Sequence, residues 1–205
     1  MLLSKAKLPL LALAVALFAT QSAHAFTIQE LTNGTTPSFS VGSITFSDFS
    51  ASALGSLNPD LSQYQLTVNG TDLVVTGPFT TSGTGGQFLL SYTATSTQPI
   101  TDVSAAIEGS VGSGYAALGE DWNKSAGGKF ATTRLQLDPG DTSASAAFSH
   151  NPGQSELLIQ KELTLVGETS VRSFTQGFTA VPEPTSVALV GGGLLGLFLK
   201  GRRKA

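Results

Sequence analysis

The sequence predicts an all-β protein, an antiparallel β-sandwich flanked by an N-terminal signal peptide and a short C-terminal transmembrane helix. Between residues 26 and 180, apolar and polar residues repeatedly alternate with the period of two that is typical of a half-buried strand. Glycine and proline separate these segments, as expected for turns between short strands. The two longest apolar runs lie at the ends of the chain, outside this alternating region.

The first 25 residues have the three parts of a secretory signal peptide. Lys5 and Lys7 supply a positive start, residues 8–18 are apolar, and Ala23-His24-Ala25 gives the small-x-small pattern that signal peptidase accepts. The alternative is an uncleaved anchor helix, but the run is short for a bilayer span of ~20 apolar residues. We therefore expect signal peptidase to cleave after Ala25 and the chain to be exported.

Residues 26–180 form the predicted sandwich domain. Residues 64–68 and 73–75 alternate on either side of Asn69-Gly70, a pair that favours a tight hairpin turn. Further strands are expected at residues 26–29, 39–41, 44–46, 87–97, 100–108, 130–137, 143–148, 156–166 and 171–178. The glycine-rich stretch 109–128 is expected to be a loop region.

The topology of the sandwich remains open between jelly-roll and immunoglobulin-like arrangements. Both consist of about nine or ten short antiparallel strands connected by turns. A β-solenoid would show self-similarity at a fixed period, and this sequence has none.

Residues 181–205 form a three-part tail. Pro182-Glu183-Pro184 ends any preceding strand, because proline cannot donate to a β-ladder. A predicted transmembrane helix covers about residues 185–199, and the basic residues that stop it in the membrane are Lys200, Arg202, Arg203 and Lys204. Basic residues stay on the cytoplasmic side, so the domain lies on the other side of the membrane, as the signal peptide also requires.

This tail resembles the PEP-CTERM sorting signal of exopolysaccharide-producing Gram-negative bacteria. The resemblance implies processing by an exosortase, a transpeptidase-like membrane enzyme that recognises the motif and removes the tail. Pro182, Glu183 and Pro184 would then be substrate residues for that enzyme rather than catalytic residues. The implied route is a transient inner-membrane anchor, with the domain outside the cytoplasm, followed by the cell surface or extracellular matrix.

Charge and cysteine content exclude several function classes. Residues 26–180 hold five basic residues against thirteen acidic ones, and none of the basic residues precedes Lys124. A nucleic-acid-binding protein needs a basic surface to neutralise phosphates, so we expect no nucleic-acid partner. The absence of cysteine excludes disulfides and thiolate ligands, and a single histidine in the domain cannot build a closed zinc site.

Catalytic patterns are weak, and we expect no enzymatic activity. His150 is the one histidine available for a Ser-His-Asp triad, but it stands in turn-like sequence and no G-x-S-x-G motif is present. A glycosidase needs two carboxylates at a set separation, and the sequence fixes no such distance. The candidates for that pair are Glu108, Glu120, Asp121 and Asp138.

No cofactor is expected, with calcium as the alternative for an acidic β-protein. Asp138-Pro139-Gly140-Asp141 and Asn58-Pro59-Asp60 offer oxygen ligands of the kind that calcium takes. Both patterns also make good type I turns without an ion, and we expect turns.

The sequence thus leads to three hypotheses in order. The first is a secreted, non-enzymatic surface or matrix protein. The second is a carbohydrate-binding module for exopolysaccharide, with Trp122 and Tyr115 as glycan contacts; the alternative for Trp122 is a buried anchor of its loop. The third is a secreted hydrolase.

Overall fold

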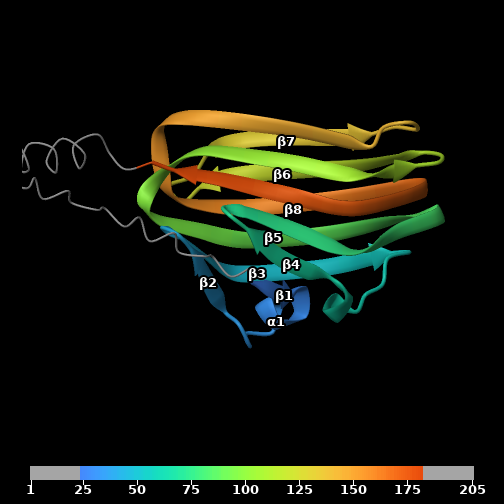
Figure 1. The fold of residues 1–205 in the computed structure, drawn as a ribbon, viewed down its shortest axis with the longest axis horizontal. Coiled ribbons are helices and arrows are strands. Elements are labelled where there is room, and N and C mark those ends of the chain that lie inside the picture. The colour runs from blue at the N-terminus through green and yellow to red at the C-terminus, as the bar shows by residue number, and fades with distance from the viewer. Residues whose placement is uncertain (1–23, 182–205) are drawn as a thin grey trace, which may run out of the picture.

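The computed structural model describes residues 24–181, most of which lie in antiparallel strands (Figure 1). This confirms the predicted all-β architecture. The elements are β1 (Ala25–Thr27), α1 (Ile28–Thr32), β2 (Ser38–Val41), β3 (Ile44–Gly55), the 3-10 helix η1 (Leu61–Gln63), β4 (Gln65–Asn69), β5 (Asp72–Val111), β6 (Tyr115–Lys124), β7 (Lys129–Leu137) and β8 (Ser143–Ala180).

One long antiparallel ribbon makes up most of the fold. Its first arm runs through β5 and β6, and its second arm returns through β7 and β8, with the turn 124–129 at the tip. The paired residues, from tip to open end, include Trp122 and Ala131, Ala105 and Ala146, Tyr92 and Ile159, and Leu73 and Gln176. A ribbon rolled up across two sheets is a jelly roll, so the topology is jelly-roll rather than immunoglobulin-like.

Rolling the ribbon produces two layers, because β5 and β8 are long enough to pass from one to the other (Figure 1). Layer A contains, in order, β2, β3, residues 86–96 of β5, residues 156–166 of β8, β6 and β7. Layer B contains β1, β4, residues 72–83 of β5, residues 169–180 of β8, residues 100–111 of β5 and residues 143–149 of β8.

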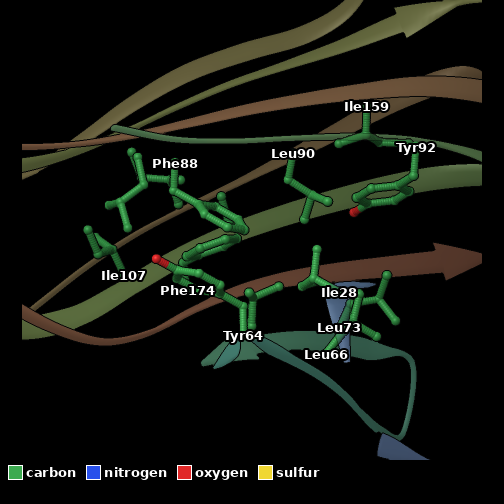
Figure 2. Close-up of a cluster of buried hydrophobic side chains, with 14 of the residues drawn as sticks. Ile28, Tyr64, Leu66, Leu73, Phe88, Leu90, Tyr92, Ile107, Ile159 and Phe174 are labelled. Carbon is green, nitrogen blue, oxygen red and sulfur yellow. The ribbon is translucent and has the colours of Figure 1, made fainter. Parts of the chain in front are cut away.

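The two layers enclose one apolar core rich in aromatic side chains. Figure 2 shows Phe88 and Leu90 of layer A meeting Phe174, Tyr64 and Leu73 on the opposite side. The ring centroids of Phe88 and Phe174 lie 6.1 Å apart. The alternation seen in the sequence therefore separates residues that face this core from residues that face outward, as expected for packed antiparallel sheets.

Glycine shapes the corner at which β8 crosses between layers. Gly167 has a φ of +79°, and a Cβ built there would lie 2.2 Å from the carbonyl oxygen of Ser113. Gly114, directly before β6, has a φ of +85° and would place its Cβ 2.1 Å from the carbonyl oxygen of Val166. Only glycine fits either position, because both the dihedral angle and the close backbone approach exclude a side chain.

Several predicted elements are confirmed. The hairpin around Asn69-Gly70 is β4 paired with the start of β5, with Asn69 opposite Asp72 and Gly70 at a φ of +64°. The strands expected near residues 39–41, 87–97, 100–108, 130–137, 143–148, 156–166 and 171–178 all lie in strands of the structure.

Three local predictions are wrong. The stretch 109–128 is not a loop region, because β6 occupies its middle and places Trp122 in the core. The segment 26–29 is only partly a strand: Thr27 and Glu30 form a capping box that starts α1 at Ile28. His150 lies within β8 rather than in a turn.

The predictions for the two ends fall largely outside the described residues. This holds for residues 1–23, including Ala23 of the cleavage pattern, and for residues 182–205 with the motif, the expected membrane helix and the basic tail. Ala25 lies in the described part and begins β1. Between residues 24 and 181, neither helix has the length and apolarity of a membrane span.

Candidate functional site

A shallow trough crosses the outer face of layer A, and its floor is Gly119. In the middle of β6, Gly119 stands opposite Arg134 of β7 on one side and opposite Glu162 of β8 on the other. Because glycine has no side chain, nothing fills the space between the arginine and the glutamate. A Cβ built on Gly119 would meet only the carbonyl oxygen of Glu162, at 3.8 Å.

The trough consists of two adjoining hollows that share Gly119 and Glu162. The first has a volume of about 370 Å³ and the second of about 300 Å³. Most of the wall is built from hydrogen-bonding side chains, with Tyr115 as the aromatic one. The residues whose side chains face the trough are Gln87, Leu89, Tyr115, Ala117, Asp121, Thr132, Arg134, Gln160, Glu162 and Thr164.

Neighbouring strands hold these polar groups in place. Glu162 accepts hydrogen bonds from Gln87 Nε2 at 2.5 Å and from Thr164 Oγ1 at 3.2 Å. Lys129 Nζ donates to Asp121 Oδ1 at 2.7 Å. The hydrogen bonds from Lys129 and Thr132 lower the pKa of Asp121, so its carboxylate is charged at neutral pH. The trough thus presents hydrogen-bonded carboxylate and amide groups to solvent, next to the guanidinium group of Arg134.

A second polar group, the buried cluster, lies inside the sandwich and consists of Glu120, Lys161, Gln176 and Trp122. The side chains of Lys161 and Glu120 are 2% and 0% exposed. Lys161 Nζ donates to Glu120 Oε1 within layer A and to Gln176 Oε1 of layer B, the latter at 2.8 Å. Trp122 Nε1 also donates to Gln176 Oε1, at 3.1 Å.

Burial controls the ionisation of this cluster. Loss of solvent raises the pKa of Glu120, opposed by the positive charge of Lys161. Loss of solvent likewise lowers the pKa of Lys161, opposed by Glu120. Both directions favour the neutral forms, because a low-dielectric interior penalises each charge.

The structure corrects the expectation for Trp122. Its side chain is 0% exposed, contacts Phe148 of layer B and hydrogen-bonds Gln176, so it is not available to stack on a sugar. The alternative of a buried anchor holds for Trp122. Tyr115 is half-buried and lines the trough, so its role as a glycan contact stays a prediction.

The candidate acids do not converge on one site. Glu120 and Asp121 are adjacent in β6 and therefore point to opposite faces of layer A, Glu120 into the core and Asp121 into the trough. Glu108 is exposed in layer B, and Asp138 lies in the turn after β7. His150 contacts the ring of Phe130 and lies 3.3 Å from Lys124 Nζ.

Of the two stretches considered for calcium, residues 138–141 form a turn and residues 58–60 lead into η1. Asp60 caps η1 by accepting from the backbone N–H of Ser62, and Asp141 accepts from the backbone N–H of Asp138 at 3.0 Å. Within residues 24–181, no three acidic or histidine side chains gather as a metal site would require.

The sequence does not predict the contact between Lys161 and Gln176. The one visible signal is Lys161 itself, the only charged residue at an inward position of the alternating segment 157–165. Nothing in the sequence indicates that Gln176 meets it, because the two residues lie in different layers.

Comparison with known proteins identifies the tail. Residues 180–204 match the family model of the PEP-CTERM protein-sorting motif, which confirms the resemblance predicted from the three-part tail. The motif indicates an exported protein that is sorted through the membrane, and it implies processing by an exosortase. No curated protein matches the chain.

Several solved structures share parts of the chain path. The carbohydrate-binding module TmCBM61, in complex with β-1,4-galactotriose, is 8% identical, with a TM-score of 0.46 over 65% of this chain and 88% of that module. The CBM22-1 xylan-binding domain of Paenibacillus barcinonensis Xyn10C is 13% identical, with a TM-score of 0.33 over 78% and 96%. The family 11 module of Clostridium thermocellum is 8% identical, with a TM-score of 0.26 over 68% and 87%. Similarity at this level does not indicate what this chain binds.

Proposed function

We propose that this chain, which carries a PEP-CTERM sorting motif, is an exported, non-enzymatic surface or matrix protein whose trough binds exopolysaccharide. The observation that carries the proposal is the arrangement at Gly119, where a residue without a side chain opens space between Arg134 and Glu162. Sugars are bound by side chains that donate to and accept from hydroxyl groups, and the trough walls are mostly of this kind.

The absence of a catalytic role is part of the proposal. Glycoside hydrolysis needs an acid and a second carboxylate facing one bond, and Glu120 and Asp121 point away from each other. The other acid in the trough, Glu162, already accepts from Gln87 and Thr164. These groups suit binding of a polyhydroxylated ligand better than transfer of a proton to it.

Filling the trough should remove binding without harming the fold. Gly119→Val places a side chain where the backbone has room, and valine suits a strand better than glycine. We expect the free energy of unfolding to stay equal or to rise by about 0.5–1 kcal/mol, and affinity for exopolysaccharide from the producing bacterium to fall at least tenfold, or about 1.4 kcal/mol. Affinity gel electrophoresis and urea denaturation measure the two quantities.

The matched control is Ser170→Val, an exposed position on β8 in layer B. It adds an apolar side chain of the same kind to the opposite outer face and should leave retention in the gel unchanged. Equal retention of the wild-type chain and Gly119→Val would refute the trough as the binding site.

The route of the protein is tested separately at the sorting motif. Glu183→Ala should leave the tail uncut, so that the protein accumulates in the membrane fraction with Lys200 to Lys204 still present. The wild-type chain should be found outside the cell, beginning at Phe26 and lacking this basic end. Peptide mass spectrometry of both fractions distinguishes the forms, with Glu168→Ala at an exposed corner of the domain as control. Wild-type protein found only in the membrane with its tail intact would contradict the expected processing.

A further inference from the structure

The buried cluster places an amine and a primary amide in contact at the centre of the sandwich. Lys161 Nζ lies 2.8 Å from Gln176 Oε1, and both side chains are almost completely shielded from solvent. Lys161 belongs to the part of β8 in layer A and Gln176 to the part in layer B. The contact therefore bridges the two layers across the corner at Gly167.

The ion pair in this cluster is poorly suited to a purely stabilising role. Taking two charges out of water is costly, and the cost is recovered only when every polar atom finds a partner. Glu120 Oε2 is buried without any hydrogen-bond partner among the described residues. Transfer of the Lys161 proton to Glu120 would remove both charges and leave a neutral, nucleophilic amine, a state that the directions of both pKa shifts favour.

The amide of Gln176 is held in a fixed orientation. Its Nε2 donates to the carbonyl oxygens of Ser104 and Gly177, at 2.9 and 3.0 Å. Its Oε1 accepts from Trp122 Nε1. Negative charge would develop on this oxygen if the amide carbon were attacked, and a donor placed there in a water-excluded site stabilises such charge.

We propose that Lys161 and Gln176 form an intramolecular isopeptide bond, with Glu120 as the proton carrier. The neutral Nζ attacks Cδ of Gln176, the Cδ–Nε2 bond breaks, and ammonia leaves. Protonated Glu120 gives its proton to the departing nitrogen and takes one from Nζ, so the carboxyl group ends as it began. No oxidant, metal or second substrate is required, and the two layers become covalently joined.

A tryptic digest of the full-length chain tests this bond. Trypsin does not cleave after an acylated lysine, so residues 135–172 should stay uncut at Lys161 and be joined to the peptide that begins at Ser173. The joined species should be lighter than its two parts by one ammonia. A linear peptide 135–161 as the main product would overturn the proposal. A bond from Lys161 to Glu120, with loss of water, would overturn the assignment of Gln176.

Two variants test the role of Glu120. Glu120→Gln should leave Lys161 free and cleavable, because the amide cannot carry the proton. Glu168→Gln, at an exposed glutamate of β8 outside the trough and the buried cluster, should form the bond as the wild-type chain does. An independent measurement starts from a wild-type chain that is synthesised and kept in urea and is then refolded. Its tryptic digest should contain the joined peptide only after folding. Its presence in chain that was never allowed to fold would exclude catalysis by the folded cluster.

Discussion

Replacing Glu120 by leucine is expected to lower the free energy of unfolding by about 3–5 kcal/mol, because the amine of Lys161 stays buried without the carboxyl group that it contacts and, on the proposal above, without its bond to Gln176. Among residues 24–181, Gln176 would then be the one remaining hydrogen-bond acceptor for Lys161. The loss should be visible as a lower midpoint in urea denaturation followed by circular dichroism.

The neighbouring residue supplies the control for this experiment. Asp121→Asn changes an acid one position along β6, but on the solvent-facing side of the same strand, where it forms an ion pair with exposed Lys129. Surface ion pairs contribute about 0–1 kcal/mol, so this change should have a small effect. Equal losses for the two variants would mean that the buried contact between Glu120 and Lys161 does not control stability.

Replacing Trp122 by alanine is expected to be similarly severe, at about 3–5 kcal/mol, because it removes the largest fully buried side chain and leaves a cavity. The Gln176 oxygen also loses one of its two donors.

Tyr115→Ala, in contrast, should change the free energy of unfolding by about 1 kcal/mol and should weaken exopolysaccharide binding, since Tyr115 lines the trough.

The two aromatic variants therefore separate stability from binding. Urea denaturation and affinity gel electrophoresis on both proteins give the comparison, with Trp122→Ala assayed at a temperature where it remains folded. Folded Trp122→Ala that binds like the wild-type chain, beside Tyr115→Ala that does not, is the expected pattern. The reverse pattern would place the glycan contact at the indole and contradict the burial of Trp122.

The local patterns of the sequence predicted the strands because side chains that alternate along a strand must alternate between core and solvent. The alternation of Leu157, Ile159, Leu163 and Leu165 follows directly from this rule. The same rule did not predict β6, because Gly112, Gly114 and Gly119 give this segment the composition of a loop. In the structure, Gly114 allows two backbone segments to approach closely at a corner, and Gly119 leaves the trough open. Neither glycine indicates irregular structure.

The sequence by itself determined the sorting motif of the tail and the class of fold, and it predicts the signal peptide. A charged start, an apolar run and a small-x-small site require only local order, and the same is true of the Pro-Glu-Pro tail with its basic end. Alternation with a period of two is equally local, so it predicts strands without naming their partners.

Only the tertiary structure decided which residues meet. Rolling the ribbon brought Gln176 to Lys161 from the opposite layer and set Arg134 and Glu162 on either side of Gly119. It also turned adjacent Glu120 and Asp121 to opposite faces, one into the buried cluster and one into the trough. The physical reason is that strand pairing and layer packing join residues far apart in the chain, and their register depends on the whole core rather than on any short segment.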